Sequence, residues 1–203
     1  GEANASYDNG GVYETLLPAL IKSWRRELFD AHIPFYVMEL AGYSDDRFAR
    51  LREEQRKVCD SLERVYLIPN FDLGSRTDIH PRTKDVLAGR IVKTYLATNL
   101  GRDVPYLAPV VKEVKIKNNT VTVIFDNVYD GLKANGQAVT GFMVAGSDGI
   151  YHSADAFISG KDRVDVSSPE VSDPVTVRYC FKGFTEGVNL YNSAGMPPYP
   201  FRS

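Results

Sequence analysis

The sequence predicts two modules: part of a doubly wound α/β sheet over residues 1–101, followed by an all-β sandwich over residues 102–203. Up to residue 101, apolar residues recur at helical spacing between short runs that are almost continuously apolar. After Pro105 the apolar residues instead alternate with polar ones, in short segments separated by turn residues. With 203 residues and a hydrophobic content of 43%, the chain can bury two small cores.

Three helices are predicted in the first module. The first spans Val12 to Asp30, where apolar residues recur every three or four positions with Lys, Arg and Glu between them. The same pattern predicts a second helix from Phe48 to Leu62. A third is predicted from His80 to Leu100, with Pro81 at its first position, because proline fits the first turn of a helix.

Two short apolar runs lie between these helices. Phe35 to Leu40 is almost continuously apolar, as expected of a parallel strand that is covered on both faces. Val65 to Pro69 is a second predicted strand. Two strands cannot form a stable doubly wound sheet alone, so we expect residues 1–101 to supply only part of one.

The second module is predicted to be a sandwich of short strands. The predicted strands are Val110 to Ile116, Val121 to Phe125, Gly141 to Ala145, Ala156 to Ile158, Val164 to Val166 and Val175 to Cys180. The tail from Gly187 to Ser203 is rich in Asn, Tyr and Pro. We therefore expect the tail to be ordered but irregular.

Composition and charge exclude several classes of partner. The 24 Lys and Arg residues against 26 Asp and Glu give a net charge of −2, too small a field to attract nucleic acid or an anionic membrane. No apolar run approaches the ~20 residues that span a bilayer. Three scattered histidines without clustered cysteines or carboxylates give no metal site, and we expect no cofactor. Cys59 and Cys180 are expected to be buried free thiols, although a disulfide between them stays open.

Several short blocks form an ordered set along the chain. In order they are Gly1-Glu2-Ala3-Asn4-Ala5, Phe71-Asp72-Leu73-Gly74, Asp78-Ile79-His80-Pro81, Phe125-Asp126-Asn127, Gly141-Phe142-Met143-Val144-Ala145-Gly146, Val177-Arg178-Tyr179 and Asn189-Leu190-Tyr191-Asn192. Together they resemble the sialate O-acetylesterases, members of the SGNH-type hydrolases, over essentially the whole chain. The resemblance implies the C-terminal half of a bacterial enzyme, periplasmic or secreted, that removes acetyl esters from sialic acid or related glycans.

This resemblance implies a serine-histidine mechanism in which His80 is the general base and later protonates the leaving sugar hydroxyl. The predicted N-cap position would keep its imidazole neutral, because the positive end of a helix disfavours imidazolium. Asp78 is the first candidate for orienting the Nδ1 atom of His80. SGNH hydrolases usually place this acid three residues before the histidine, where this chain has Thr77. Asp72 and a backbone carbonyl group are the alternatives.

In the family that the chain resembles, the nucleophilic serine lies upstream of the Gly1-Glu2-Ala3-Asn4-Ala5 block, so we expect it outside this chain. Ser6, Ser23, Ser44 and Ser75 lack a nucleophile-type sequence context. The expected partner is therefore the N-terminal half of the same enzyme. Glu2 is expected to be a buried acceptor rather than a catalytic residue.

A second function is suggested by aromatic residues near the C-terminus, namely a non-catalytic glycan-binding or scaffold module. These residues are Tyr179, Phe181, Phe184, Tyr191 and Tyr199. They could stack on the faces of sugars, or they could pack against the α/β layer.

Overall fold

The computed structural model describes residues 1–5, 11–136 and 138–203, which form two units. The first unit comprises Gly1–Arg102 together with Lys182–Phe184, and the second comprises Asp103–Phe181 and Thr185–Ser203. The short segment Lys182–Phe184 therefore belongs structurally to the first unit, although it lies far along the sequence.

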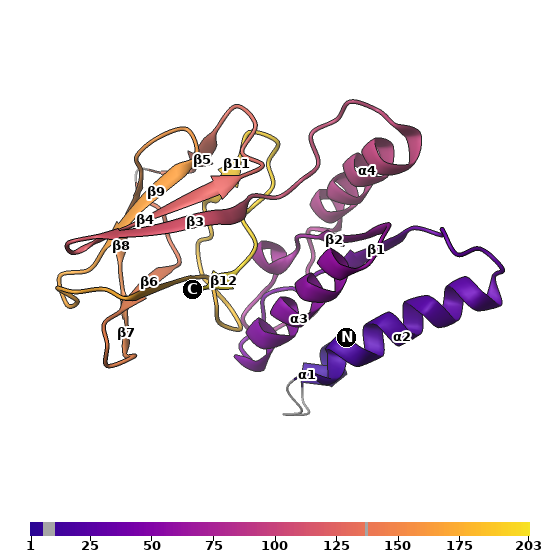
Figure 1. The fold of residues 1–203 in the computed structure, drawn as a ribbon, viewed down its shortest axis with the longest axis horizontal. Helices are drawn as coiled ribbons and strands as arrows, with labels where there is room; N and C mark the ends of the chain where they lie inside the picture. Colours follow the sequence, from indigo (N-terminus) through magenta and orange to yellow (C-terminus); the bar gives the residue numbers. More distant parts are fainter. Residues whose placement is uncertain (6–10, 137) are drawn as a thin grey trace. The chain divides into compact units, whose positions relative to one another are not determined.

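The first unit has helices on both faces of a parallel strand pair (Figure 1). Its elements are α1 (Glu2–Ala5), α2 (Val12–Glu27), β1 (Phe35–Met38), α3 (Arg47–Ser61), β2 (Val65–Ile68), η1 (Phe71–Leu73) and α4 (Lys84–Leu100). On one face, Phe35 and Val37 pack against a core made by α2, α3 and β2. On the other face, the ring of Tyr36 contacts Tyr95 of α4 at 6.2 Å between centroids. This layering is that of an α/β unit.

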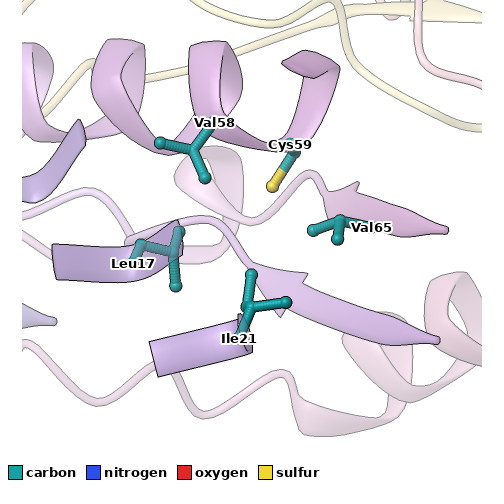
Figure 2. Packing of buried hydrophobic residues seen from close by; sticks show 5 residues of the cluster. All are labelled: Leu17, Ile21, Val58, Cys59 and Val65. Atoms are coloured by element: carbon teal, nitrogen blue, oxygen red, sulfur yellow. The ribbon is translucent and has the colours of Figure 1, made fainter. Parts of the chain in front are cut away.

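The core between α2, α3 and β2 is shown in Figure 2. Leu17 and Ile21 come from α2, Val58 and Cys59 from α3, and Val65 from β2. Each of the Leu, Ile and Val side chains contributes roughly 1.5–3 kcal/mol when fully buried. Burial also raises the pKa of the Cys59 thiol to about 12, so Cys59 behaves as a small apolar residue. Both cysteines are buried, and no disulfide joins them within the described residues.

The third predicted helix starts later than expected. Helix α4 begins at Lys84 with Thr83 at its N-cap position, whereas His80 and Pro81 lie in the non-helical segment before it. The physical reason is local: the backbone N–H of His80 donates to Oδ1 of Asp78 at 2.9 Å, forming a turn, and a residue before proline avoids the helical region. The predicted N-cap position of His80 was wrong, and the argument from the helix dipole does not apply to it.

The second unit contains two four-stranded antiparallel sheets. One has the order β3-β4-β9-β8 and the other β12-β10-β6-β7, while β5 and β11 pair separately. The strands are β3 (Val110–Lys117), β4 (Thr120–Asp126), β5 (Leu132–Ala134), β6 (Phe142–Ala145), β7 (Tyr151–Ser153), β8 (Asp155–Ile158), β9 (Arg163–Ser167), β10 (Thr176–Tyr179), β11 (Leu190–Asn192) and β12 (Phe201–Arg202). All six predicted strands are present, and the prediction of an all-β second module is confirmed.

Aromatic rings join the two larger sheets of this unit. Phe125 of β4 contacts Phe201 of β12 at 6.2 Å, and Phe201 in turn contacts Phe142 and Tyr179. The predicted irregular tail was wrong in part, because β11 and β12 lie in it and pair with distant strands. Tyr179 is fully buried, so it is not available to stack on a sugar.

Candidate active site

Two loops meet where the parallel strands of the first unit end. The backbone N–H of Gly42 donates to the carbonyl of Phe71 at 3.1 Å, and the N–H of Ser75 donates to the carbonyl of Gly42 at 3.0 Å. A Cβ atom at Gly74 would overlap the backbone of Gly42. Glycine is therefore required for this close approach. In open parallel sheets, ligands bind outside the carboxyl ends of the strands, so a ligand site is expected at these loops.

Glu39 links the two loops from inside. Its side chain is buried, and Oε2 accepts the backbone N–H groups of Asn70 at 3.0 Å and Phe71 at 3.3 Å. In return, the Asn70 side chain donates to the carbonyl of Glu39 at 3.0 Å. Burial raises the pKa of Glu39 to about 7, although the nearby Arg52 guanidinium acts in the opposite direction. The carboxyl group thus fixes the loop after β2 to the end of β1.

Arg52 and Gln55 of α3 hold the first of these loops in place. Both side chains are 2% exposed. Arg52 donates to the carbonyls of Ala41 and Gly183 at 3.3 Å each, and also to the carbonyl of Lys182. Gln55 accepts the N–H of Leu40 at 3.0 Å. Buried polar groups on α3 therefore bind both the loop after β1 and the Lys182–Phe184 segment.

Asp72 and Arg90 form a buried ion pair with two parallel contacts of 2.7 and 2.6 Å. Arg90 also donates to the carbonyl of Pro69 at 2.8 Å. The pair fastens α4 to the loop after β2, and it uses both carboxylate oxygens of Asp72. No hydrogen bond or ion pair joins Asp72 to His80 within the described residues. In the structure, Asp72, the alternative candidate for orienting His80, therefore pairs with Arg90 instead.

Asp78 and His80 flank a residue that is anchored in the core. Ile79 packs against the buried cluster that contains Leu40, Phe48 and Leu51. Its two neighbours face solvent, with side-chain exposures of 42% for Asp78 and 79% for His80. Oδ1 of Asp78 accepts the backbone N–H of His80 and lies 3.5 Å from Nδ1 of its ring. The structure therefore brings together the two residues that the sequence singled out.

This arrangement suits a general base, although the ring contact is looser than an ordinary hydrogen bond. A carboxylate beside Nδ1 favours the tautomer with its proton there, which leaves Nε2 free to accept a proton. Catalytic contacts are often long before substrate binds. Asp78 is the one polar side-chain partner of the His80 ring in the described part of the chain.

Two further expectations concern the other end of the first unit. Glu2 is half-exposed rather than buried, so its predicted role as a buried acceptor was wrong. Ser6 lies outside the described residues. Ser75 makes a local contact, in which its hydroxyl accepts the N–H of Thr77 at 3.4 Å.

Sequence reasoning missed most of the buried polar groups behind the site: Glu39, Arg52, Gln55 and Asn70. A signal existed for two of them. Arg52 and Gln55 follow Phe48 and precede Cys59 at helical spacing, which places them on the buried face of α3.

The described residues contain no cluster of three or more histidine, cysteine or acidic side chains that could bind a metal. None of the helices within ranges 1–5, 11–136 and 138–203 is long and apolar enough to cross a membrane. In the second unit, residues 125–129 and 159–163 line an open hollow of about 690 Å³.

One solved structure is similar to this chain over its whole length. The chain matches the crystal structure of a novel carbohydrate acetylesterase from Xanthomonas citri, with a TM-score of 0.89 and 35% sequence identity. The chain is related to a carbohydrate acetylesterase. The match covers 100% of this chain and 48% of that protein, so the chain spans about half of its length. No family model matches the sequence, and no curated protein does so. The predicted fold class, a partial α/β sheet followed by antiparallel sheets, is confirmed.

Proposed function

We propose that this chain is part of a bacterial carbohydrate O-acetylesterase, periplasmic or secreted, of the sialate O-acetylesterase type. Its substrates would be acetyl esters on sialic acid or related glycans, and His80 would be its general base. The observation that carries the proposal is the Asp78–His80 pair, with 3.5 Å between Oδ1 and Nδ1, in a chain that is 35% identical to a carbohydrate acetylesterase.

The proposed reaction has two halves. A serine hydroxyl attacks the acetyl carbonyl carbon while Nε2 of His80 takes the hydroxyl proton. The tetrahedral intermediate collapses, the ester C–O bond breaks, and the imidazolium returns the proton to the leaving sugar oxygen. Water then attacks the acetyl-serine with His80 again as base, which releases acetate and restores the serine. Asp78 would hold the proton on Nδ1 throughout.

In this proposal, the nucleophile and the donors for the oxyanion lie in a segment that corresponds to the unmatched part of the carbohydrate acetylesterase. The proposal therefore requires such a segment for activity. The exposure of the His80 ring supports this division, because a base that serves a serine from elsewhere needs an open Nε2 side.

The test is acetate release from acetylated sialic acid and acetylated sugars by the enzyme assembled from both parts. We expect His80→Ala to lower kcat by at least ~10³-fold, because the proton then has no acceptor. Asp78→Asn should lower kcat less, while Thr77→Ala, in the same loop, should leave it near the wild-type value. Wild-type turnover by His80→Ala would remove His80 from the mechanism.

A second candidate function, glycan binding by the β unit, is favoured by the hollow of about 690 Å³, which lies within the roughly 300–1,000 Å³ of ligand pockets. It predicts measurable heat when plain or acetylated glycans are titrated into the full chain, and weaker binding by Lys161→Ala. A titration without heat or chemical-shift change would reject it.

A further inference from the structure

Two arginine side chains lie next to each other on the outer face of one sheet in the second unit. Arg178 of β10 is paired directly with Arg202 of β12 in the antiparallel register. The adjacent pair, Tyr179 and Phe201, is buried and therefore points to the inner face. Because successive side chains of a strand alternate between its two faces, Arg178 and Arg202 both point outward. We name these two residues the arginine pair.

The register of the arginine pair is electrostatically unfavourable. Side chains directly opposite each other on antiparallel strands have Cβ atoms about 4.5–5.5 Å apart, and like charges in such positions destabilise the sheet. An arginine stays protonated in proteins, so loss of a proton cannot relieve the repulsion. An anion bound between the two guanidinium groups would offset both charges at once.

Aromatic rings of the same unit hold both guanidinium groups. The Cζ atom of Arg178 lies 4.0 Å from the centroid of the Tyr151 ring. The Cζ atom of Arg202 lies 4.8 Å from the centroid of the Phe181 ring. The Tyr151 ring is fixed in turn, because its hydroxyl lies 3.0 Å from the hydroxyl of Thr176. Stacking uses the face of a guanidinium, whereas its N–H donors lie in the plane, so the rings orient the donors before a ligand binds.

Arg178 keeps most of its capacity to donate hydrogen bonds. Within the described residues its guanidinium donates to the sulfur of Met143 at 3.1 Å, and it forms no ion pair there. A thioether sulfur is a weak acceptor, and a guanidinium has five N–H donors. Arg178 is half-buried, so its charge is less screened by water than that of a fully exposed arginine. An anionic acceptor therefore gains more at Arg178 than at an ordinary surface arginine.

We propose that the arginine pair binds the carboxylate of an acidic sugar in a glycan. A carboxylate is planar and has two oxygens, which match the fork of N–H donors that each guanidinium presents. The choice of a sugar as the carrier of the carboxylate rests on the proposed function, in which the substrates are acetylated glycans. The site recognises the charge of the glycan and takes no part in breaking the ester. It is distinct from the hollow lined by residues 125–129 and 159–163, which includes neither arginine of the pair.

The test follows the side-chain Nε–H signals of the arginines in the full chain by heteronuclear NMR, at constant ionic strength, while one probe at a time is added. The probes are N-acetylneuraminic acid, its methyl ester, which lacks the charge, and inorganic sulfate. We expect N-acetylneuraminic acid to shift the signals of Arg178 and Arg202 in a saturable manner. The methyl ester should shift neither signal, because it cannot form charge-assisted hydrogen bonds.

A matched set of variants locates the site. Arg178→Gln and Arg202→Gln should each weaken binding of N-acetylneuraminic acid at least ~10-fold, because each removes one of two charge-assisted contacts. Arg163→Gln is the control and should bind as the wild type does. Arg163 is exposed in the same unit, lies 3.1 Å from Asp162 and lines the hollow. Arg202 is exposed, so Arg202→Gln keeps the inference testable if Arg178→Gln fails to fold.

Four results would overturn the inference. The first is an equal response to N-acetylneuraminic acid and to its methyl ester, and the second is wild-type affinity in folded Arg178→Gln or Arg202→Gln. The third is binding of sulfate without binding of N-acetylneuraminic acid. The fourth is loss of binding in Arg163→Gln alone, which would place the sugar in the hollow. Binding at the arginine pair without acetate release by the assembled enzyme would contradict the proposed function and leave this site standing.

Discussion

Replacing Glu39 by glutamine should change the pH dependence of stability in a predictable direction. Glutamine keeps a neutral oxygen that can accept the backbone N–H groups of Asn70 and Phe71, but it cannot ionise. The charged groups that face Glu39 are Arg52, which favours its carboxylate, and Asp72, which disfavours it. Burial dominates both and raises the pKa of Glu39 from 4.5 to about 7.

The sign and size follow from linkage. The folded state holds the proton at pH values where the unfolded state has lost it, so this group's contribution to stability is fully present below about pH 4.5. The contribution is lost as the pH rises through about 7. The difference of 7 − 4.5, or 2.5 pKa units, corresponds to about 3 kcal/mol at 1.36 kcal/mol per unit. Glu39→Gln should therefore be more stable than the wild type in alkaline buffer, by up to about 3 kcal/mol, and similar to it at acidic pH.

The assay is urea unfolding followed by Trp24 fluorescence, which reports the first unit because the chain has no other tryptophan. Buffers well below and well above pH 7 bracket the titration of Glu39. Glu63→Gln is the control, since Glu63 is exposed. Its stability should follow the wild type at both pH values. A Glu39→Gln variant that is less stable than the wild type in alkaline buffer, or that keeps the wild-type pH dependence, would refute the reasoning.

Two further substitutions test the loops behind the site. Gly74→Ala places a Cβ atom against the backbone of Gly42, so we expect a lower unfolding midpoint in urea and weaker activity of the assembled enzyme. Gly89→Ala is the control. Because no atom lies within 4 Å of the added Cβ there, this variant should be as stable as the wild type or more stable. Asp72→Asn leaves the Arg90 guanidinium buried without its carboxylate and should cost about 3–5 kcal/mol of stability, measured by urea unfolding. An unchanged midpoint for either variant would contradict the packing described here.

Periodicity alone predicted the helices and strands that bury an apolar face. Helix α2 was predicted to reach Asp30, but it ends at Glu27. The reason is that Phe29 adopts a left-handed backbone conformation, which the residue pattern did not predict. Strands β5, β7, β11 and β12 were not predicted, because each is only two or three residues long. Such short strands are defined by their pairing, as β11 is with β5 and β12 with β10, and not by a residue pattern of their own.

The residues of the candidate site also differ in whether the sequence could predict them. The Asp78–His80 pair is local in sequence, so spacing and resemblance could identify it. Glu39 could not be identified, because its acceptor role depends on N–H groups 31 and 32 residues away. Helical spacing alone could have placed Arg52 on the buried face of α3, but its carbonyl partners at Lys182 and Gly183 become apparent only in three dimensions.

Those carbonyl partners have a consequence for biosynthesis. Two carbonyl groups that accept hydrogen bonds from the Arg52 guanidinium, those of Lys182 and Gly183, are translated about 130 residues after it. The first unit therefore cannot complete its hydrogen bonding until Phe184 has left the ribosome, by which time most of the β unit has already been made. A nascent chain arrested between the two modules should accordingly be more open to protease than the released protein. A cut made at the module boundary of the sequence would separate Arg52 from the carbonyl groups of Lys182 and Gly183 that accept its hydrogen bonds.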